Sequence, residues 1–317
     1  MREIMDCTGD AIKKAAQALK DGNLVAFPTE TVYGLGADPT NESAVSRIYS
    51  VKGRPANHPL IIHVSSKSLL IKWTRDIPEY ALLLAEKFWP GPMTLILTRS
   101  GLAKDFITGF QDCVGIRIPN QPIALQLLSE FEKLGGHGIA APSANRFGAV
   151  SPTTANDVAI ELGSFLGADD LIIDGGQCSI GVESTIIDCT KSLPVILRPG
   201  AITSEMITNL VGPFLTSNVN RIKTSGMLEA HYSPRAKVLL GISANPGDGF
   251  IALSNIPTPQ GVHRLAAPLD VEGYAKELYI ALRAGDLQGI ETIVAIPPEG
   301  VGLAEAIRDR LFKAAVR

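Results

Sequence analysis

Residues 26–36 read AFPTETVYGLG, an apolar run that is interrupted by Thr29, Glu30 and Thr31 before apolar residues return. The glycines that follow suit a strand that ends in a turn, because glycine tolerates left-handed backbone angles. A strand end that only packs has no need of three adjacent hydrogen-bonding side chains. The stretch therefore predicts either an ordinary strand end or the wall of a polar binding site.

Helical and extended patterns alternate around this stretch. Apolar residues three or four positions apart predict helices at 11–20, with Asp10 as the N-cap, and at 42–51, 78–88, 123–134 and 154–163. Short apolar runs bounded by turn residues predict strands at 23–28, 60–64, 93–98, 113–119, 170–176, 184–190 and 194–200. This alternation predicts an α+β fold in which helices pack on a mixed sheet that ends near Gly200.

A polar, turn-rich segment at 213–236 separates this block from a smaller one. We expect a linker there, between a catalytic domain at 1–212 and a small α/β domain at 237–317. The second block offers strands at 237–242, 249–255 and 292–297 and helices at 272–285 and 303–315. Its order of elements is Rossmann-like, but it has no glycine fingerprint for a dinucleotide.

The composition argues against several classes of protein. The 317 residues contain 29 Lys and Arg against 32 Asp and Glu, so the net charge of −3 provides no overall field for a nucleic-acid backbone. The four cysteines form no C-x-x-C pair, and neither an H-E-x-x-H nor a P-loop motif occurs. The apolar runs are far shorter than the roughly 20 residues that cross a bilayer, and the first ten residues lack a signal-peptide core. We therefore expect a cytoplasmic protein without membrane contact and without a metal site formed by protein side chains.

Lys52 and Arg54 stand two residues apart, just after the helix expected at 42–51. The helix dipole alone favours cations at this end. A lysine point charge beside an arginine fork is also the pair that phosphate oxygens require. In the next strand, His63 alternates with apolar neighbours, a pattern more typical of a core residue than of a ligand.

The loop at 140–155, AAPSANRFGAVSPTTA, is rich in small and hydroxyl-bearing residues and follows a buried strand. Such a loop suits a site in which backbone N–H and hydroxyl groups face an anion. Residues 151–154 could equally form the cap of the next helix.

Two arginines lie inside otherwise apolar strands, Arg117 in VGIRIP and Arg198 in VILRPG. A buried guanidinium group is costly without an anion, so each arginine requires a partner. Glu183 or Asp188 could provide it from within the chain, and a bound carboxylate or phosphate could do so equally well.

The order of the motifs resembles one family throughout. PTETVYGLG, KGRPANHPLIIH, GIRIP, APSANRFG with SPT, DGGQCSIGVESTI, LRPG and HYSP follow one another as in the two-domain threonylcarbamoyl-AMP synthases, which join a YrdC-type domain to a C-terminal extension domain. The resemblance spans about 10–202, the linker and the stretch 302–315. Its most specific part is the K-x-R and S-x-N pairing of Lys52, Arg54, Ser143 and Asn145.

This resemblance implies an enzyme that condenses L-threonine, bicarbonate and ATP into L-threonylcarbamoyladenylate and releases pyrophosphate. A partner transferase would then pass the threonylcarbamoyl group to an adenosine of tRNA, giving t6A, so tRNA itself would be bound at most weakly or indirectly. Mg²⁺ is expected on the triphosphate, with phosphate and water as its main ligands. The chemistry requires positioned reactants and cations rather than a covalent nucleophile.

The resemblance also implies roles for individual residues. The residues implied as catalytic are Lys52, Arg54, Ser143 and Asn145. Those implied to line the threonine pocket are Thr31, His63, Arg117 and Ser184. Those implied around the nucleotide are Arg54, His58, Ala141, Ser143, Ser151, Arg198 and Tyr232. Arg117 would take the threonine carboxylate, and Lys52 and Arg54 the phosphates.

The expected linker carries the family's G-M-x-x-x-H-Y-x-P element at Gly226, Met227, His231, Tyr232 and Pro234. In the family this segment folds back over the active site, which implies a cover that shields reactive intermediates from water. The chain departs from the family pattern at two positions. Ser225 replaces a usual proline and would loosen closure, whereas Phe147 replaces a frequent serine and is expected to matter little.

Two alternative functions stay open. A basic concave face would make the first domain a binding module for double-stranded RNA or tRNA, but the net acidity and the polar pocket residues speak against it. Carbamoyl transfer through a carbamoyl-adenylate, as in larger enzymes with this domain, would need a further transferase domain, for which about 80 C-terminal residues leave no room.

Overall fold

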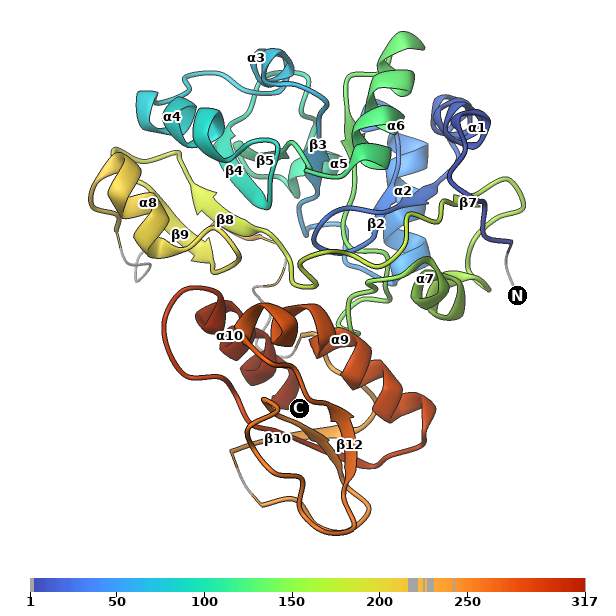
Figure 1. The fold of residues 1–317 in the computed structure, drawn as a ribbon. Helices are drawn as coiled ribbons and strands as arrows, with labels where there is room; N and C mark the ends of the chain where they lie inside the picture. Colours follow the sequence, from blue (N-terminus) through green and yellow to red (C-terminus); the bar gives the residue numbers. More distant parts are fainter. Residues whose placement is uncertain (1–2, 216–221, 225, 227–230, 242, 317) are drawn as a thin grey trace.

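The structure is a computed structural model that describes residues 3–215, 222–224, 226, 231–241 and 243–316. The elements up to helix α8 (Ser204–Val211) form one body, and those from strand β10 (Lys237–Leu240) onward form a second body, drawn below the first in Figure 1. The described residues between α8 and β10 contain no helix or strand.

The largest sheet of the first body has six strands in the order β6-β3-β5-β4-β8-β9. Their bounds are Ile139–Ala140 (β6), Ile61–His63 (β3), Cys113–Arg117 (β5), Met93–Thr98 (β4), Thr185–Asp188 (β8) and Val195–Arg198 (β9). The β3/β5 and β4/β8 pairs are parallel, and the other neighbours are antiparallel. His63 and Arg117 are register partners, so the sheet itself brings these two predicted site residues together.

The polar interruption lies in a second sheet with the order β2-β1-β7. Its strands are Gly34–Gly36 (β2), Val25–Phe27 (β1) and Leu171–Ile172 (β7). The expected mixed sheet is therefore divided in two, because the chain turns after β1 and returns antiparallel onto it as β2. Isolated bridges from Ala37 to Ala140 and from Gly34 to Ser143 join the two sheets.

Helices cover both sheets (Figure 1). Besides α8 and the 3₁₀ turn η1 (Lys67–Leu69), they are α1 (Gly9–Lys20), α2 (Glu42–Lys52), α3 (Leu70–Trp73), α4 (Glu79–Phe88), α5 (Asp105–Thr108), α6 (Pro122–Lys133) and α7 (Ala155–Leu162). The N-cap of α1 is Thr8 rather than Asp10, because the Thr8 hydroxyl accepts a hydrogen bond from the Ala11 N–H at 3.2 Å. Gly53 ends α2 with a left-handed φ of 61°, which turns the chain toward Arg54.

The second body is a parallel four-stranded sheet with two helices. The sheet order is β10-β13-β11-β12, with β13 at Thr292–Ala295, β11 at Gly249–Ile251 and β12 at His263–Ala266. The helices are α9 (Val271–Leu287) and α10 (Leu303–Ala315). Strand β12 was not predicted, because its sequence HRLA begins with two polar residues and offers no continuous apolar run.

The two bodies share one hydrophobic cluster. Val32, Val150 and Val182 of the first body pack in the same cluster as Leu278 and Leu311 of the helices α9 and α10. Figure 1 shows these two helices on the side of the second body that faces the first. The helices of the second body therefore reach the segment beside the polar interruption.

Candidate active site

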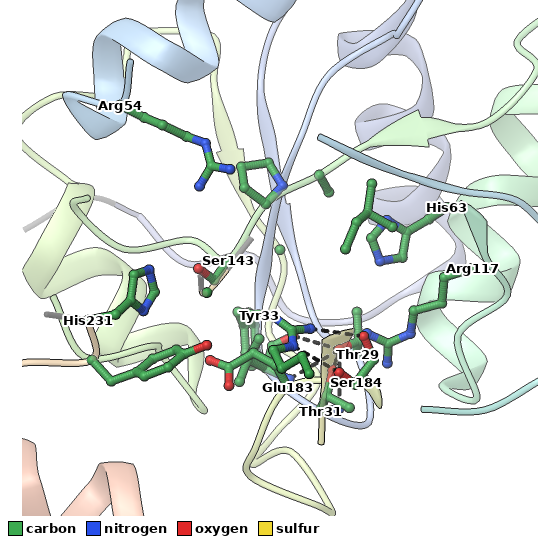
Figure 2. Close-up of a pocket in the computed structure, with 18 residues that line it drawn as sticks. Thr29, Thr31, Tyr33, Arg54, His63, Arg117, Ser143, Glu183, Ser184 and His231 are labelled. Carbon is green, nitrogen blue, oxygen red and sulfur yellow. Dashed lines mark hydrogen bonds between the residues drawn. The ribbon is translucent and has the colours of Figure 1, made fainter. Parts of the chain in front are cut away.

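One pocket lies where the turn after β1, strands β3 and β5 and the described linker residues meet (Figure 2). All four residues predicted for threonine line it: Thr31, His63, Arg117 and Ser184. Residues predicted for the nucleotide also line it: Arg54, Ala141, Ser143, Arg198 and Tyr232. In Figure 2, Arg54, Ser143 and His231 lie on one side of the view and His63 and Arg117 on the other.

The polar interruption forms a tight turn and a pocket wall at once. The Thr29 hydroxyl donates to the Val32 carbonyl at 2.6 Å, and it lies 2.9 Å from the Thr31 hydroxyl. Both threonines are buried, and both line the pocket. The two interpretations of this stretch therefore apply together, because the residues that close the turn also line the pocket.

Arg117 has its acidic partner inside the polar interruption. Its guanidinium lies 2.8 Å from the Glu30 carboxylate, and both side chains are buried. The candidates Glu183 and Asp188 were wrong for Arg117, since Asp188 instead accepts hydrogen bonds from the Thr190 N–H and hydroxyl. Burial and the neighbouring Arg117 charge lower the pKa of His63 to about 3, so its ring is neutral at pH 7.

Ser184 connects the two sides of the pocket. Its hydroxyl lies 2.8 Å from that of Thr94 and accepts a hydrogen bond from Arg198 at 3.1 Å. Arg198 also donates to the Ser184 carbonyl at 3.0 Å. These bonds fix Arg198 against the segment that carries Ser184.

Arg54 brings a positive charge to the opposite side. Its guanidinium donates to the Pro59 carbonyl at 3.0 Å and lies 5.7 Å from the centre of the Phe147 ring. Burial lowers the pKa of Arg54 to about 10, which leaves it charged at pH 7. The Phe147 ring also contacts the rings of His58 and His231. The expectation that phenylalanine in place of serine matters little stays a prediction.

Four predicted residues do not line the pocket: Lys52, His58, Asn145 and Ser151. Lys52 is buried beneath the loop that carries Ser143, and its ammonium donates to the carbonyls of Ser143, at 2.6 Å, and of Asn145. The Asn145 amide donates to the Arg146 and Ala149 carbonyls of the same loop. Ser151 donates to Glu183 at 2.6 Å. The structure thus places Lys52 and Asn145 as supports of the loop.

The support by Lys52 leads to a testable prediction. Lys52→Met keeps the length of the side chain but leaves two carbonyls without their hydrogen-bond donor, so we expect a loss of about 2–3 kcal/mol in the free energy of unfolding. Urea denaturation measures it, with Lys14→Met on the exposed side of α1 as the control. Loss of activity at unchanged stability would contradict the supporting role and would favour direct phosphate contact.

The described linker residues form part of the pocket wall. Gly226, His231 and Tyr232 line it, and burial lowers the pKa of His231 to about 3 and raises that of Tyr232 to about 12. Gly226 has a φ of +85°, and a Cβ added there would lie 2.4 Å from the Tyr232 hydroxyl, so only glycine fits. Ser225 and Met227 lie outside the described residues, and the expected effect of Ser225 on closure stays a prediction.

Glu183, which the sequence offered as a partner for a buried arginine, lines the pocket, and its charge interacts with those of Arg310 and Arg198. Burial alone would raise the pKa of its carboxyl, but Arg310, Arg198 and the hydrogen bond from Ser151 together lower it to about 2. Arg310 comes from α10, so its approach to Glu183 could not be read from local sequence.

Comparisons with known proteins assign the chain to a family. Residues 17–200 match the family model described as Telomere recombination, and residues 202–316 match Threonylcarbamoyl-AMP synthase, C-terminal domain. The threonylcarbamoyl-AMP synthase of Pyrococcus abyssi is 41% identical over 96% of this chain and 93% of its own length. This chain belongs to the threonylcarbamoyl-AMP synthases. The Bacillus subtilis member is 38% identical, over 96% of this chain and 92% of its own.

Solved structures agree with this assignment. The crystal structure of P. abyssi Sua5 complexed with L-threonine superposes with a TM-score of 0.89 and 39% identity, covering 99% of this chain and 97% of that one. Escherichia coli YciO matches with a TM-score of 0.53 at 23% identity, which shows a shared fold alone, over 62% of this chain and 95% of its own. The two-domain architecture predicted from the sequence is therefore confirmed.

Proposed function

We propose that this pocket holds L-threonine beside ATP, and that the chain makes L-threonylcarbamoyladenylate from L-threonine, bicarbonate and ATP with release of pyrophosphate. One observation carries the proposal: positive and hydroxyl side chains suited to these reactants face a single hollow. They are Arg54, Arg117, Arg198, Thr31, Ser143 and Ser184. The L-threonine complex of the related P. abyssi protein supports an amino-acid site in this fold.

The side of the pocket around Arg117 suits threonine. The Arg117 guanidinium would bind the threonine carboxylate through charge-assisted hydrogen bonds, while its ion pair with Glu30 holds the guanidinium in place. Neutral His63 and the hydroxyls of Thr31 and Ser184 would then contact the polar remainder of the amino acid.

The opposite side suits the triphosphate. Arg54 and Arg198 would offset phosphate charge, Ser143 would offer its hydroxyl, and Ala141 its backbone. Lys52 and Asn145 would act indirectly, because their hydrogen bonds hold the loop that contains Ser143. Tyr232 would contact the nucleotide from the linker.

The reaction needs these two ligands in line. The amine of threonine combines with bicarbonate, with loss of water, to give a carbamate. A carbamate oxygen then attacks the α-phosphorus of ATP, the bond from that phosphorus to the β-bridging oxygen breaks, and pyrophosphate leaves. The protein's own residues bind, align and offset charge, while His231 and Tyr232 restrict the access of water to the labile intermediates.

Among the described residues, no group of three or more His, Cys, Asp or Glu side chains could hold a metal ion. Among the described residues that line the pocket, Glu183 alone carries a carboxylate, and that carboxylate is engaged by Ser151, Tyr279 and Arg310. We propose that Mg²⁺ arrives on ATP with phosphate and water ligands.

Product analysis tests the function. Purified protein mixed with L-threonine, labelled bicarbonate, ATP and Mg²⁺ is expected to yield an adenylate that carries the label, together with pyrophosphate, in the absence of tRNA. Mass spectrometry detects both products. Strict dependence on added RNA would instead favour the RNA-binding module.

We further propose that the product passes to a t6A transferase, that tRNA contacts this chain weakly if at all, and that the enzyme works in the cytoplasm, where ATP and threonine are available. Among the described helices, each is too short or too polar to cross a membrane. We keep the division into a catalytic domain at 1–212, a linker at 213–236 and a C-terminal domain at 237–317 as part of the proposal.

A further inference from the structure

Two side chains of the C-terminal body reach the carboxylate of Glu183. Arg310 of α10 donates through its Nε to the carboxylate at 2.8 Å, and the Tyr279 hydroxyl of α9 lies 2.9 Å from the same oxygen. The third contact is local, from Ser151 to the other oxygen. Glu183 is 6% exposed and Arg310 is completely buried. The carboxylate of the catalytic body is therefore offset by charges from both bodies, Arg198 from its own and Arg310 from the other.

Arg310 is held in place on several sides. It donates to the Pro199 carbonyl at 3.0 Å and to Asp309 at 2.7 Å. Its guanidinium also lies 5.4 Å from the centre of the Tyr232 ring, which stacks against Tyr279 at 5.8 Å. The same pair of helices thus contacts both Glu183 and the linker tyrosine that lines the pocket.

The position of Glu183 makes this contact relevant to binding. Its side chain lines the pocket together with Arg54 (Figure 2). Arg198 also lines this pocket. ATP carries several negative charges, whereas threonine at pH 7 carries one positive and one negative charge. An unneutralised carboxylate here would therefore repel ATP much more than threonine.

We infer that Arg310, with Tyr279, is a positioning residue that neutralises and orients Glu183, so that the C-terminal body makes the pocket able to accept a polyanionic nucleotide. This inference rests on the proposed function, since it assigns ATP to the pocket. It gives the C-terminal body a defined part in the site.

The test compares Arg310→Met with the double variant Arg310→Met/Glu183→Gln. Arg310→Met is expected to raise the KM for ATP about tenfold, a moderate value for one uncovered charge near the phosphates, and to change the KM for threonine less than threefold. The double variant removes the uncovered charge and is expected to return the KM for ATP to within about threefold of wild type. A merely structural role of Arg310 would not predict this rescue, so a double variant no better than Arg310→Met would overturn the inference.

Arg308→Met is the matched control on the same helix. Arg308 donates to the carbonyls of Pro298 and Gly300 within its own body, and we expect its loss to leave the KM for ATP unchanged. Should Arg310→Met fail to fold, Tyr279→Phe tests the inference instead. This variant removes the hydroxyl that contacts the Glu183 carboxylate and keeps the aromatic ring. An increase of about threefold in the KM for ATP is expected there, and no increase would reject the inference.

Calorimetry separates this inference from the proposed function. It measures the affinity of the full-length protein for a non-hydrolysable ATP analogue. If wild type and Arg310→Met bind the analogue equally well, this result would overturn only the role of Arg310. Wild type that forms no labelled adenylate would instead reject the proposed function itself.

Discussion

Arg54→Ala is expected to reduce kcat/KM for ATP by about a hundredfold or more, the cost of losing one preorganised charge contact of roughly 3 kcal/mol at the transition state. Arg54 lines the pocket just after the C-terminal end of α2, and its pKa of about 10 keeps it charged throughout the neutral range. Pyrophosphate release and incorporation of labelled bicarbonate into the adenylate measure the effect.

Arg54→Lys separates charge from geometry at this position. Lysine keeps the positive charge but loses the planar fork, so we expect an intermediate loss of about tenfold. Arg75→Ala is the control, because Arg75 is largely exposed and lies outside the pocket. Full activity of Arg54→Ala would show that the phosphates do not bind at this side of the pocket.

The fold was predictable where apolar periodicity is strong. The helix at 42–51 is confirmed as α2, which ends at Gly53 as its left-handed backbone requires. The division of the first body into two sheets was not predictable, because strand patterns do not say which strands pair. Likewise α8 and β12 were missed, since SEMITNLV and HRLA are short and mix polar with apolar residues.

The candidate site shows a second limit of sequence patterns. The K-x-R and S-x-N motifs mark a region, but they do not distinguish a side chain that lines the pocket from one that supports it. Arg54 and Ser143 line the pocket, whereas Lys52 and Asn145 bond to the loop. The contact of Arg310 with Glu183 spans 127 residues of sequence and depends on the packing of two bodies, so no local pattern could predict it.

Arg117→Gln is expected to impair both threonine use and stability, because Arg117 faces two anions. In the protein it pairs with buried Glu30 at 2.8 Å, and by our proposal it also receives the threonine carboxylate. Removing one partner of a buried ion pair costs about 3–5 kcal/mol of stability, since the other charge is left uncompensated. We expect kcat/KM for threonine to fall more than about a hundredfold, as for other preorganised charges.

Arg117→Gln/Glu30→Gln separates these two effects. With both charges gone, the buried pair no longer leaves an isolated carboxylate, so urea denaturation should show most of the lost stability restored. Threonine use should stay low, because the cation that would bind the threonine carboxylate is still absent. Glu130→Gln serves as the control, since partly exposed Glu130 pairs with largely exposed Lys133 of α6, and ion pairs with an exposed partner contribute little. A double variant that recovers both stability and threonine-dependent adenylate formation would place the threonine carboxylate elsewhere, since the pocket would then bind it without Arg117.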